Sequence, residues 1–316
     1  MKPKVLCTAK FPDPVTEYLK DQAEVMPVFY PGGHGSIYER LSEVEGIMNA
    51  GVRIDAELLS HAPKLRAVAN VSVGYENFDT GAMKERGVIG TITPYVLDDA
   101  VADLIIGLML AVSRRITYLD RYIRKGMWDK GDNECLYGQP LTGRRLGIIG
   151  MGRIGAAVAK RARHGFEMEI CYHNRRSNPE WWAHYLELDQ LLETSDYIVV
   201  LAPATAETHK MIGMAQFAKM KKTEVFINAS RGWTVDENAL CVALKNGMIY
   251  GAGLDVYERE PLEPDSPLLR MDNVVLVPHI GSAIRETREA MAMTAAQCLI
   301  AALTGGEVNN IVPELT

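Results

Sequence analysis

An arginine, a histidine and a glutamate lie after or between strand-like runs in the last third of the chain. Arg231 follows the apolar run 225–228. His279 follows the run 274–277, and Glu260 lies between the two. Open parallel α/β sheets bind ligands at the carboxyl ends of their strands, so we expect these side chains at one site. An arginine can bind a carboxylate through two hydrogen bonds, a histidine can exchange a proton with an oxygen, and a glutamate can stabilise the charged imidazole. We therefore predict Arg231, Glu260 and His279 as catalytic residues; structural ion pairs or helix caps are the alternative.

Residues 150–155 fit the pattern GxGxxG. The match is specific because a strand-like run ends at residue 149 and a helical pattern follows it. Gly150 permits the tight turn, Gly152 lets backbone N–H groups approach a pyrophosphate, and Gly155 allows close packing of helix and strand. The segment predicts a bound dinucleotide; an ordinary glycine-rich turn is the alternative.

The position that contacts the adenosine ribose comes about 20 residues after such a turn and is normally acidic. Asn174 occupies it here, and Arg175 and Arg176 follow. A carboxylate would repel a 2′-phosphate, whereas an asparagine does not and arginines can bind it. The segment predicts NADP(H) as the preferred cofactor and NAD(H) as the second choice; a solvated basic loop is the alternative.

Short apolar runs alternate with helical patterns along most of the chain, which predicts parallel sheets with crossover helices. One series ends near residue 87 and another begins near 145. Between them, residues 98–116 predict a long helix that is apolar on several sides, which indicates burial in a domain core or against a partner subunit. Residues 117–143 are polar and predict an extended arm with little regular structure. Residues 283–303 predict an amphipathic helix.

Composition excludes several function classes. At about 150 residues per domain, a chain of 316 residues predicts about two domains. The net charge of -6 disfavours nucleic acid as a partner, because the phosphate backbone selects cationic surfaces. The longest apolar run, 104–112, is too short to span a bilayer, and no secretory signal is visible. The cysteines lie far apart and without metal-ligand spacing, so we expect no disulfide, no metal site and a cytoplasmic location.

Several motifs together resemble the D-isomer-specific 2-hydroxyacid dehydrogenases along nearly the whole chain. They are residues 71–79, 147–155, 230–232, 253–256 with 260–262, and 278–282. Within that family, segments 93–99, 173–175 and 217–221 look most like those of bacterial glyoxylate/hydroxypyruvate reductases and 2-ketogluconate reductases. Trp233 departs from the family pattern, which has smaller or polar residues there, and we expect it to disfavour bulky substrates.

The resemblance implies an α/β fold with two Rossmann-like, doubly wound parallel-sheet domains. Residues 1–99 and 284–316 would form a substrate-binding domain that is discontinuous in sequence. Residues 100–283 would form the NAD(P)-binding domain. The helix and arm at 98–143 would build a homodimer.

The resemblance also implies individual roles. The substrate would contact Ser72, Val73, Gly74 and Arg231, and Asp255 would lie near the nicotinamide. The cofactor would contact Val101, Gly150, Gly152, Arg153, Ile154, Gly155, Asn174, Arg175, Arg176, Ala202, Pro203, Thr208, Ala229, Ser230, Asp255, His279 and Gly281.

These features predict an enzyme that reduces small 2-oxo acids to D-2-hydroxy acids with NAD(P)H. Glyoxylate, hydroxypyruvate and 2-ketogluconate are the expected substrates. One alternative is a D-3-phosphoglycerate dehydrogenase, which shares this core, although longer versions carry a further regulatory domain after the last helix. The other is a non-catalytic dinucleotide sensor like the corepressors related to this family, which need not keep all three catalytic side chains.

Overall fold

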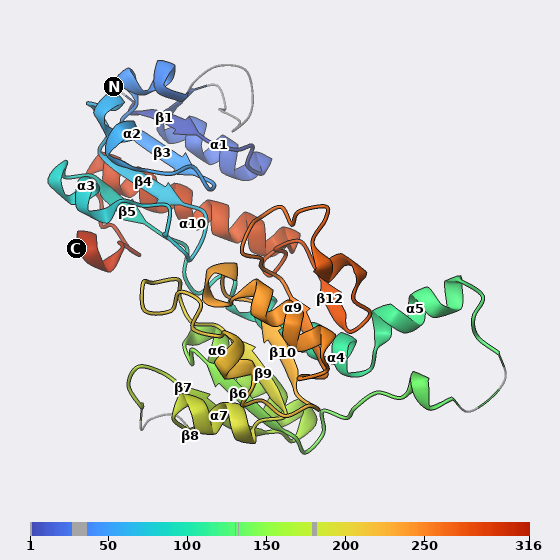
Figure 1. The fold of residues 1–316 in the computed structure, drawn as a ribbon. Coiled ribbons are helices and arrows are strands. Elements are labelled where there is room, and N and C mark those ends of the chain that lie inside the picture. Colours follow the sequence, from blue (N-terminus) through green and yellow to red (C-terminus); the bar gives the residue numbers. More distant parts are fainter. Residues whose placement is uncertain (1, 27–36, 130, 132, 179–181) are drawn as a thin grey trace. The chain divides into compact units, whose positions relative to one another are not determined.

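The chain folds into two α/β units, each built around a parallel β-sheet (Figure 1). The computed structural model describes residues 2–26, 37–129, 131, 133–178 and 182–316. One unit combines Met1–Leu97 with Ala283–Thr316, and the other spans Asp98–Ser282. The predicted fold class, with two parallel sheets and one unit discontinuous in sequence, is confirmed.

The first unit has a five-stranded sheet in the order β2-β1-β3-β4-β5. Its elements are β1 (Lys4–Cys7), α1 (Asp13–Gln22), β2 (Glu24–Val25), a 3₁₀ helix (Ile37–Glu43), β3 (Gly46–Asn49), α2 (Ala56–His61), β4 (Ala67–Asn70), α3 (Thr80–Glu85), β5 (Ile89–Thr91), α10 (Arg285–Thr304) and a 3₁₀ helix (Pro313–Leu315). Asp55 and Asp79 cap α2 and α3, because each carboxylate accepts the N–H three residues further on. Every residue of β3 and β4 is buried, as expected for strands covered on both faces.

Helix α10 fills the core of this unit instead of lying on its surface. From Met291 onward most of its side chains are buried, and they pack with side chains of α1, β1 and β4. The approach to β3 is close, since a Cβ on Gly46 would lie 2.6 Å from Leu303. The predicted amphipathic helix over 283–303 is therefore wrong in character: only its first two turns are largely exposed.

The second unit has a seven-stranded sheet in the order β12-β11-β10-β9-β6-β7-β8. Its strands are β6 (Arg145–Ile149), β7 (Glu169–His173), β8 (His184–Tyr185), β9 (Tyr197–Val200), β10 (Val225–Asn228), β11 (Gly251–Leu254) and β12 (Val274–Leu276). Its helices are α4 (Asp98–Ser113), α5 (Ile116–Arg124), α6 (Arg153–Phe166), α7 (Leu188–Thr194), α8 (Met214–Phe217) and α9 (Glu237–Lys245), with 3₁₀ helices at Glu134–Leu136, Gly232–Thr234 and Pro267–Arg270. Every residue of β9, β10 and β11 is buried, which explains their continuous apolar sequences.

The chain order of this second sheet reverses beside β6. From β6 the chain continues to β7 and β8 on one side, whereas β9 to β12 lie on the other. Ile149 at the end of β6 is in register with His173 of β7 and Val200 of β9. Open α/β sheets bind ligands at such a switch point, outside the carboxyl ends of the strands. The glycine turn at 150–155 begins there.

Helix α4 is the predicted apolar helix, and it ends earlier than expected. It packs on β10, β11, β12 and α6 and buries half of its residues. Arg115 has a left-handed conformation, with φ 55°, which interrupts the helix before the predicted end at residue 116. Among the described residues, no helix combines the length and the apolar composition needed to cross a membrane.

The segment after α4 is not the extended arm predicted over 117–143. Its first part forms α5, which projects from the body of the second unit in Figure 1. The nine residues of α5 include neither glycine nor proline, and Asp120 pairs with Arg124 one turn later at 2.9 Å. Such pairs support a helix even where the composition is polar. Residues 130 and 132 of the predicted arm lie outside the described residues.

Candidate active site

His279 and Glu260 form a hydrogen-bonded pair beyond the carboxyl ends of β11 and β12. Nδ1 of His279 lies 2.8 Å from Oε2 of Glu260. The other carboxylate oxygen, Oε1, accepts the N–H of Tyr257 at 3.1 Å. Because a carboxylate only accepts hydrogen bonds, the proton between the two side chains belongs to Nδ1. Nε2 is then the ring nitrogen that can exchange a proton with a ligand.

The surroundings of Glu260 keep its carboxyl group ionised. Burial alone would raise the pKa of Glu260, but hydrogen bonds from His279 and from the Tyr257 N–H, with the charges of His279 and Arg231, lower this pKa below its usual value. Glu260 thus offers an ionised acceptor to the Nδ1 proton of His279. The pair can therefore present a proton donor at Nε2, as general acid catalysis requires.

Asp255, directly after β11, fixes the backbone beside His279. Its carboxylate accepts the N–H groups of Ile280 at 2.6 Å and of Gly281 at 3.0 Å. His279 itself has a left-handed φ of 51°, so its side chain depends on this support. Burial raises the pKa of Asp255, while the two N–H groups and the charge of His279 oppose the rise. A Cβ on Gly281 would lie 3.0 Å from this carboxylate and 3.3 Å from Val101, so the turn is closely packed.

Arg231 is positioned by the turn after β10. The side chain of Asn228 donates to the Arg231 carbonyl at 3.2 Å, and the Arg231 guanidinium donates to the carbonyl of Ser230 at 2.7 Å. A Cβ on Gly232 would overlap the carbonyl of Tyr257. Only glycine at position 232 therefore lets this turn contact the loop that carries Glu260. Arg231 is thus close enough to contribute to the lowered pKa of that carboxylate.

The glycine turn fits a dinucleotide phosphate. Gly150 has φ 101°, and a Cβ there would lie 2.6 Å from the backbone N of Ala202. A Cβ on Gly155 would lie 3.0 Å from the carbonyl of Gly150, so helix α6 packs closely on the turn. By contrast, a Cβ on Gly152 would meet no atom within 4 Å, which leaves open space in front of the helix N-terminus. First-turn N–H groups, such as that of Ile154, and the helix dipole favour an anion in that space.

Asn174, the residue predicted to contact the ribose, turns its side-chain amide toward the glycine turn. Both polar atoms of the Asn174 amide bond to the backbone of Met151, at 2.7 Å and 3.0 Å. Arg175 and Arg176 are exposed. Arg175 lies near enough to Glu207 to lower the pKa of Glu207, although hydrogen bonds from the Thr205 side chain and the Glu207 backbone contribute more.

The remaining predicted cofactor residues of the second unit lie in three places. Ala202, Pro203 and Thr208 belong to the loop after β9, where the Thr208 hydroxyl donates to the Pro203 carbonyl at 2.5 Å. Ala229 and Ser230 belong to the turn after β10, and the Ser230 hydroxyl donates to Asn228 at 2.9 Å. Arg153 begins α6 and pairs with Asp98 at 3.2 Å.

The predicted substrate loop, Ser72 to Gly74, belongs to the first unit and follows β4. The Ser72 hydroxyl donates to the Gly74 carbonyl at 2.5 Å. Asn70, which is buried, donates to the same carbonyl at 3.0 Å and to the Ser72 hydroxyl at 2.9 Å. Neither Asn70 nor its partner Asn49, which donates to it at 3.1 Å, was predicted from the sequence. The available signal was an asparagine at the end of each apolar strand.

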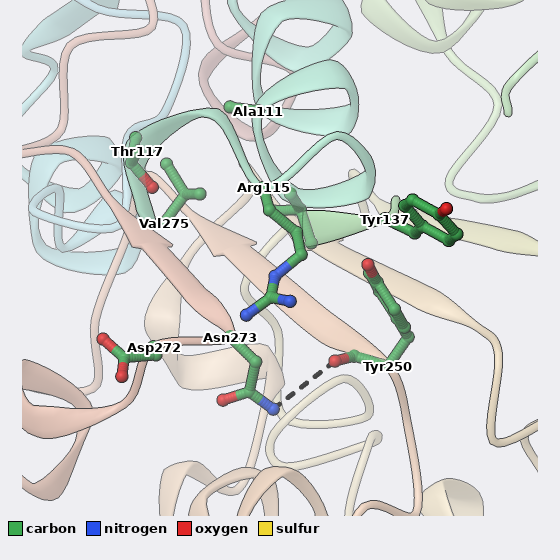
Figure 2. A pocket seen from close by; sticks show the side chains of 9 residues that line it. Ala111, Arg115, Thr117, Tyr137, Tyr250, Asp272, Asn273 and Val275 are labelled. Carbon is green, nitrogen blue, oxygen red and sulfur yellow. Dashed lines mark hydrogen bonds between the residues drawn. The ribbon is translucent and has the colours of Figure 1, made fainter. Parts of the chain in front are cut away.

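A cavity of about 250 Å³ lies elsewhere in the second unit (Figure 2). Arg115 extends toward Asn273 and Tyr250 in this view. None of the predicted site residues lines this cavity. Among the described residues, no group of three or more His, Cys, Asp or Glu side chains could hold a metal ion.

A parallel sheet with a glycine turn at its switch point, beside an acid–base pair and an arginine, defines a dinucleotide-dependent oxidoreductase. Residues 106–281 match the family described as D-isomer specific 2-hydroxyacid dehydrogenase, NAD binding domain. The chain belongs to the D-isomer-specific 2-hydroxyacid dehydrogenases, enzymes that interconvert 2-oxo and 2-hydroxy acids with a nicotinamide dinucleotide.

Individual relatives resemble the whole chain. A glyoxylate/hydroxypyruvate reductase B of Klebsiella pneumoniae is 44% identical over 318 residues, which cover 99% of this chain and 98% of the relative. The crystal structure of an NADPH-dependent glyoxylate/hydroxypyruvate reductase from Sinorhizobium meliloti, in complex with NADP and malonate, is 35% identical, with a TM-score of 0.90 over 100% of this chain and 98% of that one. A protein of Thermus thermophilus is 40% identical, with a TM-score of 0.92 over 98% and 99% of the two chains.

Proposed function

We propose that the chain reduces glyoxylate and hydroxypyruvate to the corresponding 2-hydroxy acids, with D stereochemistry at a new chiral centre, and that it prefers NADPH. The contact that carries this proposal is the 2.8 Å pair between His279 and Glu260, with Arg231 nearby. The names of the relatives support the substrate class.

This geometry supports a proposed role for each of the three side chains. The nicotinamide cofactor, when bound, supplies the hydride. His279, held by Glu260, donates a proton from Nε2 to the substrate carbonyl oxygen as negative charge develops there. Arg231 binds the carboxylate through two hydrogen bonds, and its charge stabilises the developing oxyanion. In the reverse direction a neutral His279 accepts the hydroxyl proton. The parts that Ser72, Val73 and Gly74 take in substrate binding stay predictions.

The substrate is tested with a panel of 2-oxo acids assayed for kcat/KM. Residues 67–83, around the predicted substrate loop, contain no lysine or arginine that could bind a substrate phosphate. We therefore expect kcat/KM for glyoxylate and for hydroxypyruvate to exceed kcat/KM for 3-phosphohydroxypyruvate by at least about tenfold. A tenfold difference corresponds to about one charge-assisted hydrogen bond. A preference for the phosphorylated acid would favour the D-3-phosphoglycerate dehydrogenase alternative. Absence of turnover with every acid would favour the sensor.

Activity with 2-ketogluconate stays a prediction. Trp233, which is half exposed, donates from Nε1 to the Thr205 carbonyl at 3.2 Å, and its ring lies 4.1 Å from that of His209. The indole is therefore held against the loop after β9 and adds bulk beside Arg231. We expect a lower kcat/KM for 2-ketogluconate than for glyoxylate, and a Trp233→Ala variant to reduce the difference.

The preference for NADPH is proposed from Arg175 and Arg176. Each is exposed near the end of β7, and a charge-assisted contact with a 2′-phosphate contributes about 1.5–3 kcal/mol when well aligned. One such contact should make kcat/KM with NADPH at least about tenfold higher than with NADH. The preference should fall with added salt, because exposed charges are screened. Equal use of NADH by the wild type would mean that the two arginines form a solvated loop.

A homodimer is proposed from the helix α5 and the residues after it. The arm patch, defined as Ile116, Ile123, Met127 and Trp128, is exposed, and α5 buries none of its nine described residues. Exposed apolar groups gathered on one short segment are typical of a contact with another chain. A cytoplasmic location stays a prediction.

A further inference from the structure

The amide of Asn174 is closed onto the glycine turn. Its Oδ1 accepts the N–H of Met151 at 2.7 Å, and its Nδ2 donates to the carbonyl of the same residue at 3.0 Å. We propose that Asn174 is a positioning residue that holds this turn in its phosphate-binding conformation, and that it does not itself select between NADPH and NADH. The inference rests on the proposed cofactor site.

The turn needs such a partner because of where Met151 lies. Its side chain is buried, and its peptide groups stand between Gly150, with φ 101°, and the start of α6. The neighbouring groups are paired within the backbone: Gly150 donates to the His173 carbonyl at 3.0 Å and Gly152 to the Gly150 carbonyl at 2.9 Å. A buried N–H or carbonyl without a partner is costly. The side chain of Asn174 provides a hydrogen-bond partner for both the N–H and the carbonyl of Met151.

An asparagine is required for this because the two bonds run in opposite directions. An aspartate offers only acceptors, so it would keep the bond from the Met151 N–H and place a negative oxygen against the Met151 carbonyl. A serine is one atom shorter and has one hydroxyl group. The residue type at 174 is therefore explained by the turn itself, whether or not the bound nucleotide carries a 2′-phosphate.

The pair of hydrogen bonds between Asn174 and Met151, called the clamp below, changes which residues we expect to select the cofactor. With the Asn174 amide committed to Met151, the groups beside it that can distinguish a 2′-phosphate from a hydroxyl are Arg175 and Arg176, both exposed. The clamp should affect both cofactors alike, because both carry the same pyrophosphate. The arginines should affect NADPH alone.

The experiment compares Asn174→Ala with the neighbouring Arg175→Ala. Dissociation constants of NADPH and NADH are measured by nicotinamide fluorescence, and hydrogen exchange of the amides at 150–152 is measured in protein without cofactor. We expect Asn174→Ala to raise the dissociation constants of both NADPH and NADH by about tenfold, which corresponds to the loss of two modest hydrogen bonds. The ratio of the two dissociation constants should stay within about twofold of the wild-type ratio. Exchange at the turn should become faster. Arg175→Ala should lower the NADPH preference and leave exchange at the turn as in the wild type.

Two results would overturn the inference. One is an Asn174→Ala variant that weakens NADPH alone while exchange at the turn stays unchanged, since the amide would then contact the ribose phosphate. The other is a variant that changes neither cofactor affinity nor exchange. If Asn174→Ala does not fold, Asn174→Ser, which keeps one polar group, gives the same comparison. A wild type that binds neither nucleotide would refute the proposed function, whereas the exchange measurement would still test the clamp.

Discussion

At the residue scale, Glu260 determines which nitrogen of His279 faces a ligand. It occupies Nδ1 at 2.8 Å, so Nε2 is the nitrogen that we propose as the proton donor. Replacing His279 by alanine should lower kcat for glyoxylate reduction by at least about 10²-fold, the lower range of general acid catalysis. NADPH binding, measured by fluorescence titration, should persist. A turnover near that of the wild type would remove His279 from the mechanism.

The effect of the negative charge of Glu260 can be tested separately from the hydrogen bond that orients His279. Glu260→Gln keeps a side chain that accepts a hydrogen bond and removes the negative charge. Because the charge favours the protonated imidazole, its loss should move the alkaline limb of the kcat/KM profile for reduction to lower pH. Profiles of the two proteins with glyoxylate and saturating NADPH measure the shift. An alkaline limb at the same pH in both would make Glu260 purely structural.

At the element scale, strand β10 is preceded by a buried carboxyl group. Burial raises the pKa of Glu224 to about 9, against the weaker effects of the Lys221 N–H and charge. Its Oε1 has no hydrogen-bond partner in the described part of the chain. The group is therefore protonated in the folded state at neutral pH and ionised in the unfolded state.

This group makes the stability of the fold depend on pH. The folded-state pKa is raised, so the stabilisation is complete below the unfolded-state pKa and is lost as pH rises from about 4.5 to about 9. The loss is at most about 1.4 kcal/mol per pH unit. Glu224→Gln should remove this slope, so that its advantage over the wild type in urea unfolding grows between pH 5 and pH 8. Glu286→Gln, at an exposed position of α10, is the control; equal slopes in all three proteins would contradict the expectation.

At the scale of the whole molecule, the arm patch is the feature that a second copy of the chain would cover. Trp128 is 68% exposed and is the largest side chain of the patch. Trp128→Glu should raise the dimer dissociation constant by at least about tenfold, because a charge would be buried in the contact. Sedimentation velocity over a range of concentrations measures this. Trp182→Glu, at another partly exposed tryptophan of the same unit, should leave the dimer intact. A wild-type protein that sediments as a monomer would refute the homodimer.

Much of the architecture followed from local signals. The continuous apolar sequences of β9 and β10 predict strands because a strand covered on both faces needs no polar residue. The glycines of the turn at 150–155 predict its shape, since Gly150 and Gly155 each exclude a Cβ for a different steric reason. Helix α5 was missed because its polar composition resembles that of a loop, and α10 was misjudged because its helical pattern does not show how many faces are covered.

The sequence by itself determined the fold class, the glycine turn and the identity of the residues that could bind a carboxylate or move a proton, because these depend on residue type and local spacing. Only the tertiary structure decided what each side chain contacts. Nothing in the local sequence shows that Glu260 meets Nδ1 of His279, that Asp255 holds the following turn, or that Asn174 faces Met151. These contacts join segments 19 to 26 residues apart in the chain, and the parallel sheet brings them together at the carboxyl ends of its strands.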